Sequence, residues 1–126
     1  MSTSARRLLA IDDEPSIQEI IRSTATDLNF DTRVTGRADA FKQEYEAFEP
    51  TVIVLDIVMP ETDGIELMKW LVERGATSKV IVASGYNAFY AKMAAKLGSA
   101  SGLSVAFLDK PFKVEALRSA LRDAEA

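Results

Sequence analysis

The stretch TVIVLDIVMP, residues 51–60, decides the fold: it is an apolar run of strand length that delivers one carboxylate, Asp56. Its β-branched residues are typical of a strand buried on both faces of a parallel sheet. Because a lone buried carboxylate is costly, we expect Asp56 at the carboxyl edge of the sheet, where open α/β sheets bind ligands. The segment Met59–Gly64 is predicted to be a turn, since Pro60 cannot continue the strand. Taken alone, Asp56 could also simply end the strand or cap the turn.

Apolar runs of strand length alternate with segments of helical periodicity along the whole chain. Strands are predicted over residues 8–11, 30–35, 51–56, 79–84 and 103–108. Helices are predicted over residues 15–28, 38–48, 64 to a carboxyl cap at Gly75, 87–98 and about 112–121. This alternation predicts the α/β class: a doubly wound five-stranded parallel sheet flanked by five helices. We expect one domain over residues 1–126, with a core of about 7–122 and the weakly apolar strand 30–35 at an edge.

The composition excludes several kinds of site and location. None of the 126 residues is Cys or His, which rules out disulfides, Cys or His zinc sites and catalytic triads with either residue. The net charge of −4 argues against direct binding of nucleic acid. No apolar run approaches a membrane span, and the amino terminus has no signal-peptide core. We therefore expect a cytoplasmic protein with no membrane contact.

Charged and polar residues follow the predicted strands. Asp12 and Asp13 follow the first strand, and Asp56 ends the third. Ser84 ends the fourth strand, and Lys110 follows the fifth. Since parallel strands present their carboxyl ends at one edge, these groups should converge in one crevice, where hard oxygen ligands suit Mg²⁺. Singly, each residue has a plainer interpretation as a helix-end charge, a turn residue or a surface lysine.

In this order, the residues resemble the receiver domain of two-component response regulators, including the chemotaxis-regulator-like receivers. The resemblance covers residues 8–121. It rests on the acidic pair Asp12-Asp13, on Asp56 followed by Met59-Pro60 and Asp63-Gly64, on Ser84, and on Lys110-Pro111-Phe112. It implies a flavodoxin-like receiver fold and an aspartate that accepts a phosphoryl group from the histidine of a sensor kinase.

The resemblance implies a role for each matching acidic position. Asp56 looks like the phosphoacceptor, Asp13 like a direct Mg²⁺ ligand, and Asp12 like a ligand that acts mainly through water. Val58 looks like a further ligand through its backbone carbonyl. The implied cofactor is therefore one Mg²⁺ ion held by Asp12, Asp13, Asp56 and Val58.

Further positions match the part of the family motif that responds to phosphorylation. Ser84 and Lys110 look like the contacts of the phosphoryl oxygens, and the Lys110–Pro111 peptide bond is expected to be cis. Phe107 occupies the place of the family's switch aromatic, without the hydroxyl that a Tyr would carry. Ser84 and Phe107 are thus expected to form the switch. We expect the inward position of the Phe107 ring to be readily populated, because it buries no unsatisfied polar group.

The leading hypothesis is a signalling module and not an enzyme. A sensor histidine kinase or a phosphotransfer protein would phosphorylate Asp56 in a Mg²⁺-dependent reaction. The face over residues 87–98, 103–108 and 112–121 would then change its affinity for a partner or for a second copy in a homodimer.

Two other functions are open at this point. One is a Mg²⁺-dependent phosphohydrolase that works through an aspartyl-phosphate. Against it, Val58 stands where the loosely similar haloacid-dehalogenase-like phosphatases carry a second aspartate. The other is a nucleotide- or flavin-binding module, disfavoured because the first strand-to-helix turn is acidic and lacks glycines.

Overall fold

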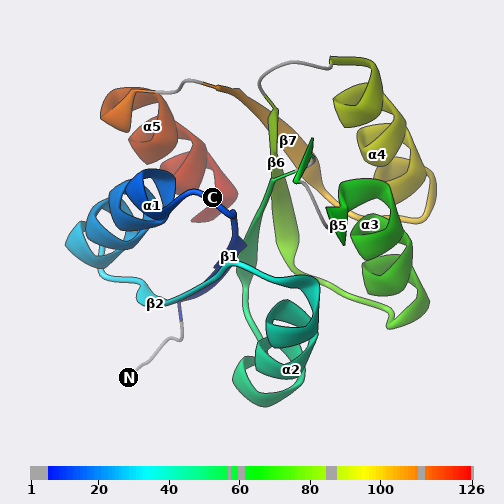
Figure 1. The fold of residues 1–126 in the computed structure, drawn as a ribbon, viewed down its shortest axis with the longest axis horizontal. Helices are drawn as coiled ribbons and strands as arrows, with labels where there is room; N and C mark the ends of the chain where they lie inside the picture. The colour runs from blue at the N-terminus through cyan, green and yellow to red at the C-terminus, as the bar shows by residue number, and fades with distance from the viewer. Residues whose placement is uncertain (1–5, 57, 60–61, 85–87, 111–112, 126) are drawn as a thin grey trace.

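The computed structural model describes residues 6–56, 58–59, 62–84, 88–110 and 113–125. Within them, five strands form one parallel sheet in the order β2-β1-β3-β6-β7 (Figure 1). These strands are β1 (Arg7–Ile11), β2 (Asp31–Thr35), β3 (Val52–Asp56), β6 (Lys79–Ser84) and β7 (Val105–Asp109). The helices between and after them are α1 (Pro15–Asp27), α2 (Ala38–Phe48), α3 (Gly64–Glu73), α4 (Ala88–Ala100) and α5 (Val114–Glu125). The predicted α/β class is confirmed, and β2 lies at an edge as expected.

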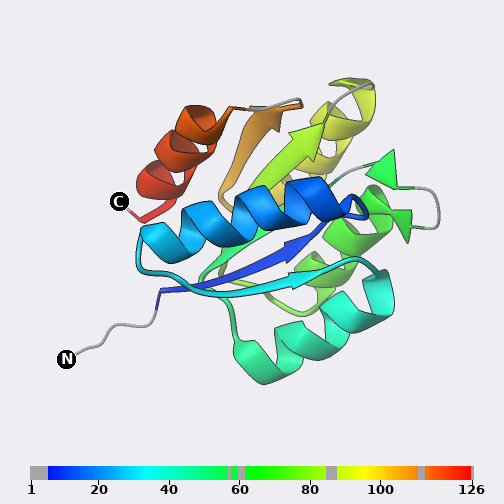
Figure 2. The same cartoon turned by 60° about the vertical axis from the view of Figure 1, so that its left-hand side comes forward.

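The helices cover both faces of the sheet. Figures 1 and 2 show α1 and α5 side by side on one face, with α2, α3 and α4 on the other. In β1, Leu9 and Ile11 pack in the core on the α2, α3 and α4 side, whereas Leu8 and Ala10 pack in the core beneath α1 and α5. Alternate residues of one strand thus enter two different cores. Every residue of β3 is buried, which explains why residues 52–56 form a continuous apolar run and not an alternating one.

Three helices end in the same hydrogen-bonded turn around a residue with positive φ. These residues are Asn29 after α1, Gly75 after α3 and Gly102 after α4, with φ values of 68°, 69° and 90°. In each turn the following amide donates to a carbonyl five residues earlier: Phe30 to Ala25, Ala76 to Leu71, and Leu103 to Gly98. This is the Schellman arrangement, which closes a helix where Gly or Asn can adopt the left-handed conformation. The predicted ends of the first and third helices are confirmed to within a residue or two.

The boundary between α4 and β7 differs from the prediction. The helix continues to Ala100 where an end near residue 98 was expected, and β7 begins at Val105 and not at Leu103. Leu103 is buried, but it packs in the core beside α3 and α4 while its amide closes the α4 cap. Its apolar character therefore belongs to the hydrophobic contact of the cap and not to the strand.

The predicted turn after β3 contains a short antiparallel ladder. Strand β4 (Val58–Met59) pairs with β5 (Thr62–Asp63), with Val58 opposite Asp63 and Met59 opposite Thr62. At the other end of the chain, α5 continues beyond the predicted residue 121 to Glu125. No helix in the described ranges is long and apolar enough to cross a membrane.

The close approach of α4 to its neighbours depends on Gly98. A Cβ atom placed on Gly98 would lie 2.9 Å from Val105 Cγ2 and 3.1 Å from the Met68 sulfur. Val105 belongs to β7 and Met68 is a fully buried residue of α3. The missing side chain at Gly98 therefore sets how closely α4 packs on α3 and on the edge of the sheet.

We predict that Gly98→Ala lowers the free energy of unfolding by about 1 kcal/mol. Overpacking costs about 1–3 kcal/mol, and the better helix propensity of Ala returns up to about 1 kcal/mol. Urea denaturation followed by circular dichroism measures the difference. The matched control is Ser99→Ala, an exposed position of the same helix that should change stability by less than about 0.5 kcal/mol. An alanine at 98 that leaves stability unchanged or raises it would contradict this account of α4 packing.

Candidate functional site

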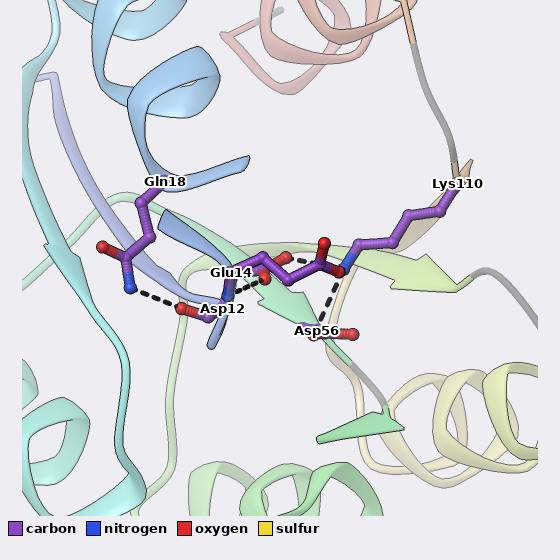
Figure 3. A network of polar contacts seen from close by, with 5 residues as sticks. All are labelled: Asp12, Glu14, Gln18, Asp56 and Lys110. Carbon is purple, nitrogen blue, oxygen red and sulfur yellow. Dashed lines mark hydrogen bonds and ion pairs between the residues drawn. The ribbon is translucent and has the colours of Figure 1, made fainter. Parts of the chain in front are cut away.

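The ends of three strands bring charged side chains together at one edge of the sheet. Asp12 follows β1, Asp56 is the last residue of β3, and Lys110 follows β7. Lys110 Nζ lies 2.7 Å from Asp12 Oδ2 and 3.2 Å from Asp56 Oδ2 (Figure 3). The Asp12 and Asp56 side chains are 2% and 4% exposed, and that of Lys110 is 13% exposed. The ammonium and both carboxylates are therefore largely removed from water.

Asp12 is held in place by its backbone as well as by its side chain. Its amide donates to the carbonyl of Thr35 at 3.0 Å, which ties the end of β1 to the end of β2. Its Oδ1 atom accepts a 2.9 Å hydrogen bond from the amide of Glu14. Its carbonyl accepts a 2.6 Å hydrogen bond from Gln18 Nε2. With Oδ1 and the backbone fixed in this way, Oδ2 remains directed at Lys110.

Asp13 completes a cluster of carboxylates that could hold a metal ion. One oxygen each from Asp12, Asp13 and Asp56 lie within 4.8 Å of one another. Asp13 is exposed, whereas the other two aspartates are buried, so the cluster opens toward solvent on the Asp13 side. Carboxylate oxygens are the hard ligands that Mg²⁺ and Ca²⁺ bind. The donor set therefore fits a divalent cation of this kind.

The surroundings of Lys110 favour its charged form. Burial by itself lowers the pKa of Lys110, but the hydrogen bond to Asp12 and the negative charges of Asp56 and Asp12 outweigh it. The pKa of Lys110 is therefore raised above its ordinary value of 10.5. Because the folded value is the higher one, this stabilising contribution is present below pH 10.5 and is lost as the pH rises through the folded pKa.

The remaining predicted positions lie at or near the same edge. Ser84 is the last residue of β6, opposite Asp109 in the β6–β7 ladder, and Val58 begins β4. The side chains of these two residues are not among those described. Phe107 lies in β7 opposite Val82, and its side chain is half exposed. The predicted cis bond between Lys110 and Pro111 lies outside the described residues.

Sequence reasoning assigned no role to two residues that contact this network. Gln18 donates to the Asp12 carbonyl, and Glu14 Oε1 lies 3.8 Å from Lys110 Nζ. The available signal for Glu14 was its place directly after the acidic pair and before Pro15. Gln18 carried no such signal, since a Gln on the first turn of a helix is ordinary.

The comparisons with known proteins identify the family. The response regulator receiver domain family matches residues 8–122, so this chain belongs to that family. The chemotaxis protein CheY of Listeria monocytogenes is 29% identical over 122 residues, which cover 94% of this chain and 97% of CheY. Among solved structures, NtrX from Brucella abortus has a TM-score of 0.85 and 26% identity, covering 96% of this chain and 27% of NtrX. The resemblance to receiver domains noted in the sequence is thus confirmed.

Several relatives are much longer than this chain. The C4-dicarboxylate transport transcriptional regulatory protein DctD of Pseudomonas aeruginosa is 31% identical over 118 residues, which are 94% of this chain but 25% of DctD. The chain spans about half, 53%, of the response regulator TodT of Pseudomonas putida. What these proteins share with this chain is a receiver domain of two-component signal transduction, a signalling module of the kind that partners with histidine kinases. Membership of this family favours the receiver over the phosphohydrolase.

We predict that Lys110→Met lowers the free energy of unfolding by about 3 kcal/mol without divalent cations, because Asp12 and Asp56 lose their buried cation. Urea denaturation at neutral pH measures this loss. Lys113→Met, at an exposed position nearby, serves as the control and should change stability by less than about 0.5 kcal/mol. Adding Asp56→Asn to the Lys110→Met variant should restore part of the loss, since one buried charge is removed. Equal losses of stability in Lys110→Met and Lys113→Met would rule out a stabilising role for the buried ammonium.

Proposed function

We propose that Asp56 accepts a phosphoryl group from a sensor histidine kinase or a phosphotransfer protein. One observation carries this proposal: Asp56 ends a buried strand with its carboxylate both in contact with Lys110 and within a three-aspartate cluster. Asp12 shares the cluster and the contact with Lys110, but it follows β1 and its Oδ1 atom accepts the amide of Glu14, whereas Asp56 is itself the last residue of the fully buried strand β3. Phosphoryl transfer consists mainly of positioning and charge stabilisation, which is what these groups offer.

The transfer uses residues whose positions the fold fixes. A carboxylate oxygen of Asp56 forms a bond to phosphorus while the bond from phosphorus to the donor's leaving group breaks, and that group departs with the bonding electrons. Lys110 exchanges its contact with Asp12 for one with a phosphoryl oxygen, and the Ser84 hydroxyl supplies a second contact from the end of β6. These exchanges balance the negative charge that the phosphoryl group adds.

Asp12, Asp13 and the backbone carbonyl of Val58, together with Asp56, would hold one Mg²⁺ ion. The ion would neutralise charge on the phosphoryl oxygens during transfer. Asp12 and Asp56 are buried and Asp13 is exposed. The donor therefore approaches from the Asp13 side, where solvent has access.

The output surface in this proposal is the face of α4, β7 and α5. An open groove of about 680 Å³ runs between β7 and α5, bordered by small residues that include Ala106, Ala116 and Ala120. Phe107 also lines this groove, and the residue is 51% exposed. We propose that phosphorylation turns the Phe107 ring inward as Ser84 moves toward the phosphoryl group. The changed face then binds a partner or a second copy of the chain.

In this proposed function, residues 1–126 form one receiver domain that acts in the cytoplasm and does not itself bind nucleic acid. The acidic surface is compatible with protein partners and unfavourable for a phosphate backbone. The chemistry of the domain is limited to gaining and losing its own phosphoryl group. A phosphohydrolase would instead turn over a small phosphomonoester many times.

Incubation with acetyl phosphate and Mg²⁺ should add one phosphoryl group to the chain, measured by intact mass. Asp56→Asn should abolish the addition, because the nucleophile is lost, and a chelator should abolish it in the wild type. Asp31→Asn, which removes an exposed carboxylate at the opposite end of a strand, should label like the wild type. Undiminished labelling of Asp56→Asn would refute the assignment of the phosphoacceptor.

Beryllofluoride with Mg²⁺, a stable mimic of the phosphoryl group, should shift amide NMR signals from Ser84 to Phe107 and along α4, β7 and α5. Signals of α2 and α3 should shift less, because neither helix is part of that face. The Phe107 ring resonances report directly whether the ring turns inward. Shifts limited to Asp12, Asp13, Asp56 and their neighbours would mean that the site binds the group without transmitting it to this face.

A further inference from the structure

Glu14 places a third carboxylate within ion-pair distance of the Lys110 ammonium, after those of Asp12 and Asp56. Its Oε1 atom lies 3.8 Å from Lys110 Nζ, and Figure 3 shows its side chain extending to that group. The Glu14 side chain is 60% exposed, whereas those of Asp12 and Asp56 are almost fully buried. Glu14 therefore occupies the outer side of the charged network, where it meets an incoming molecule before Asp56 does.

The backbone holds Glu14 in this place. Glu14 is the residue that precedes the first turn of α1, with an extended backbone of φ −95° and ψ 118°. Its amide donates to Asp12 Oδ1, and Pro15 fixes the next residue as the start of the helix. Residues at this position commonly cap the helix with their side chain, but the Glu14 side chain makes no such hydrogen bond. Its carboxylate is directed at Lys110.

The site carries an excess of negative charge to which Glu14 contributes. Asp12, Asp13, Asp56 and Glu14 have a formal charge of −4 and Lys110 adds +1, which leaves −3. A bound divalent cation would leave −1. A negatively charged phosphoryl donor is therefore repelled on approach even when the metal site is filled.

We propose that Glu14 is a specificity-determining residue that discriminates among phosphoryl donors by their negative charge. This inference rests on the function proposed for Asp56. The Glu14 carboxylate repels the donor at the mouth of the site and competes with the phosphoryl oxygens for Lys110. The repulsion grows with the charge of the donor, so small dianionic donors are slowed most. A donor protein can offset the repulsion with its own positive side chains.

The negative charge of Glu14, which repels an anionic donor, attracts a cation. A carboxylate near the metal cluster attracts Mg²⁺ without being one of its ligands. Removing the charge of Glu14 should therefore speed reaction with anionic donors and weaken Mg²⁺ binding in the same variant. A loss of local structure would instead slow the reaction with anionic donors and also weaken Mg²⁺ binding.

The test compares Glu14→Gln with two matched variants. Glu19→Gln removes the same charge from an exposed position farther along α1, and Glu14→Asp keeps the charge at position 14. Labelling rates are measured by intact mass with acetyl phosphate, mainly a dianion at neutral pH, and with phosphoramidate, mainly a monoanion, at saturating Mg²⁺. Mg²⁺ affinity is measured without donor by amide NMR titration.

Glu14→Gln should label about threefold to tenfold faster with acetyl phosphate and about twofold faster with phosphoramidate at low salt. Its Mg²⁺ affinity should fall about twofold to fivefold, and the rate differences should shrink at roughly 1 M salt. Glu19→Gln and Glu14→Asp should stay near the wild type in all measurements.

Equal acceleration with both donors, or the same effect from Glu19→Gln, would overturn the role of Glu14 and leave Asp56 as the phosphoacceptor. Unchanged rates together with unchanged Mg²⁺ affinity would do the same. A wild-type chain that neither donor labels would refute the proposed function, and this inference with it.

Discussion

The contact of one lysine ammonium with two buried carboxylates joins three strand ends of this domain. Lys110 follows β7, Asp12 follows β1 and Asp56 ends β3, yet the Lys110 Nζ atom lies within 3.2 Å of an oxygen on each aspartate. The two carboxylates carry two negative charges and the ammonium one positive charge, and all three groups are largely removed from water. The site therefore has a deficit of positive charge. The deficit favours a divalent cation in the aspartate cluster and, in the proposed function, makes the site sensitive to the charge of a molecule that reaches Asp56.

The order of the strands explains why the cation must be a lysine with a long stem. β7 is separated from β3 by β6, and β1 lies on the far side of β3. Neighbouring strands are about 4.8 Å apart, so a group that starts from the end of β7 must pass over about two strand spacings to meet Asp56. A four-carbon stem with a compact ammonium can do this, and it can also change partners by rotation within the same space. The carboxyl end of β6 lies beneath this path, which places Ser84 between the lysine's own strand and the proposed phosphoacceptor.

The sequence predicts most of this fold because each layer leaves a different pattern. Strands buried on both faces are continuous apolar runs, as in residues 52–56, and a residue that tolerates positive φ, such as Gly75, marks the end of a helix. Leu103 shows where such reasoning stops. An apolar residue after a glycine looks the same in sequence whether it begins a strand or packs back on a helix cap, and only the tertiary contact decides between them.

In the site, too, the sequence predicts some features, and tertiary contacts alone decide the others. Strand ends place the aspartates and the lysine at one edge by topology alone, so their meeting follows from the order of elements. The contact of Glu14 with Lys110 does not follow from that order, because it depends on one side-chain direction at the start of α1. The buried aspartates Asp12 and Asp56 and the exposed Glu14 also have different parts in the electrostatics. The buried charges determine which ions the site can hold, and the exposed one influences which molecules reach it.

The position of β7 connects this charge balance to the output surface in the proposed function. β7 is an edge strand that pairs with β6 alone in the described sheet, so a shift of β7 disturbs one ladder where a shift of β3 would disturb two. The strand carries Phe107, and Lys110 follows it, so the group that senses the charge at Asp56 is three residues from the exposed ring. Movement of Lys110 from Asp12 toward a phosphoryl oxygen therefore acts on an edge strand that contacts α4 and α5. A lysine anchored on a central strand would have no such freedom, which makes the edge position of β7 a physical requirement of the proposed switch.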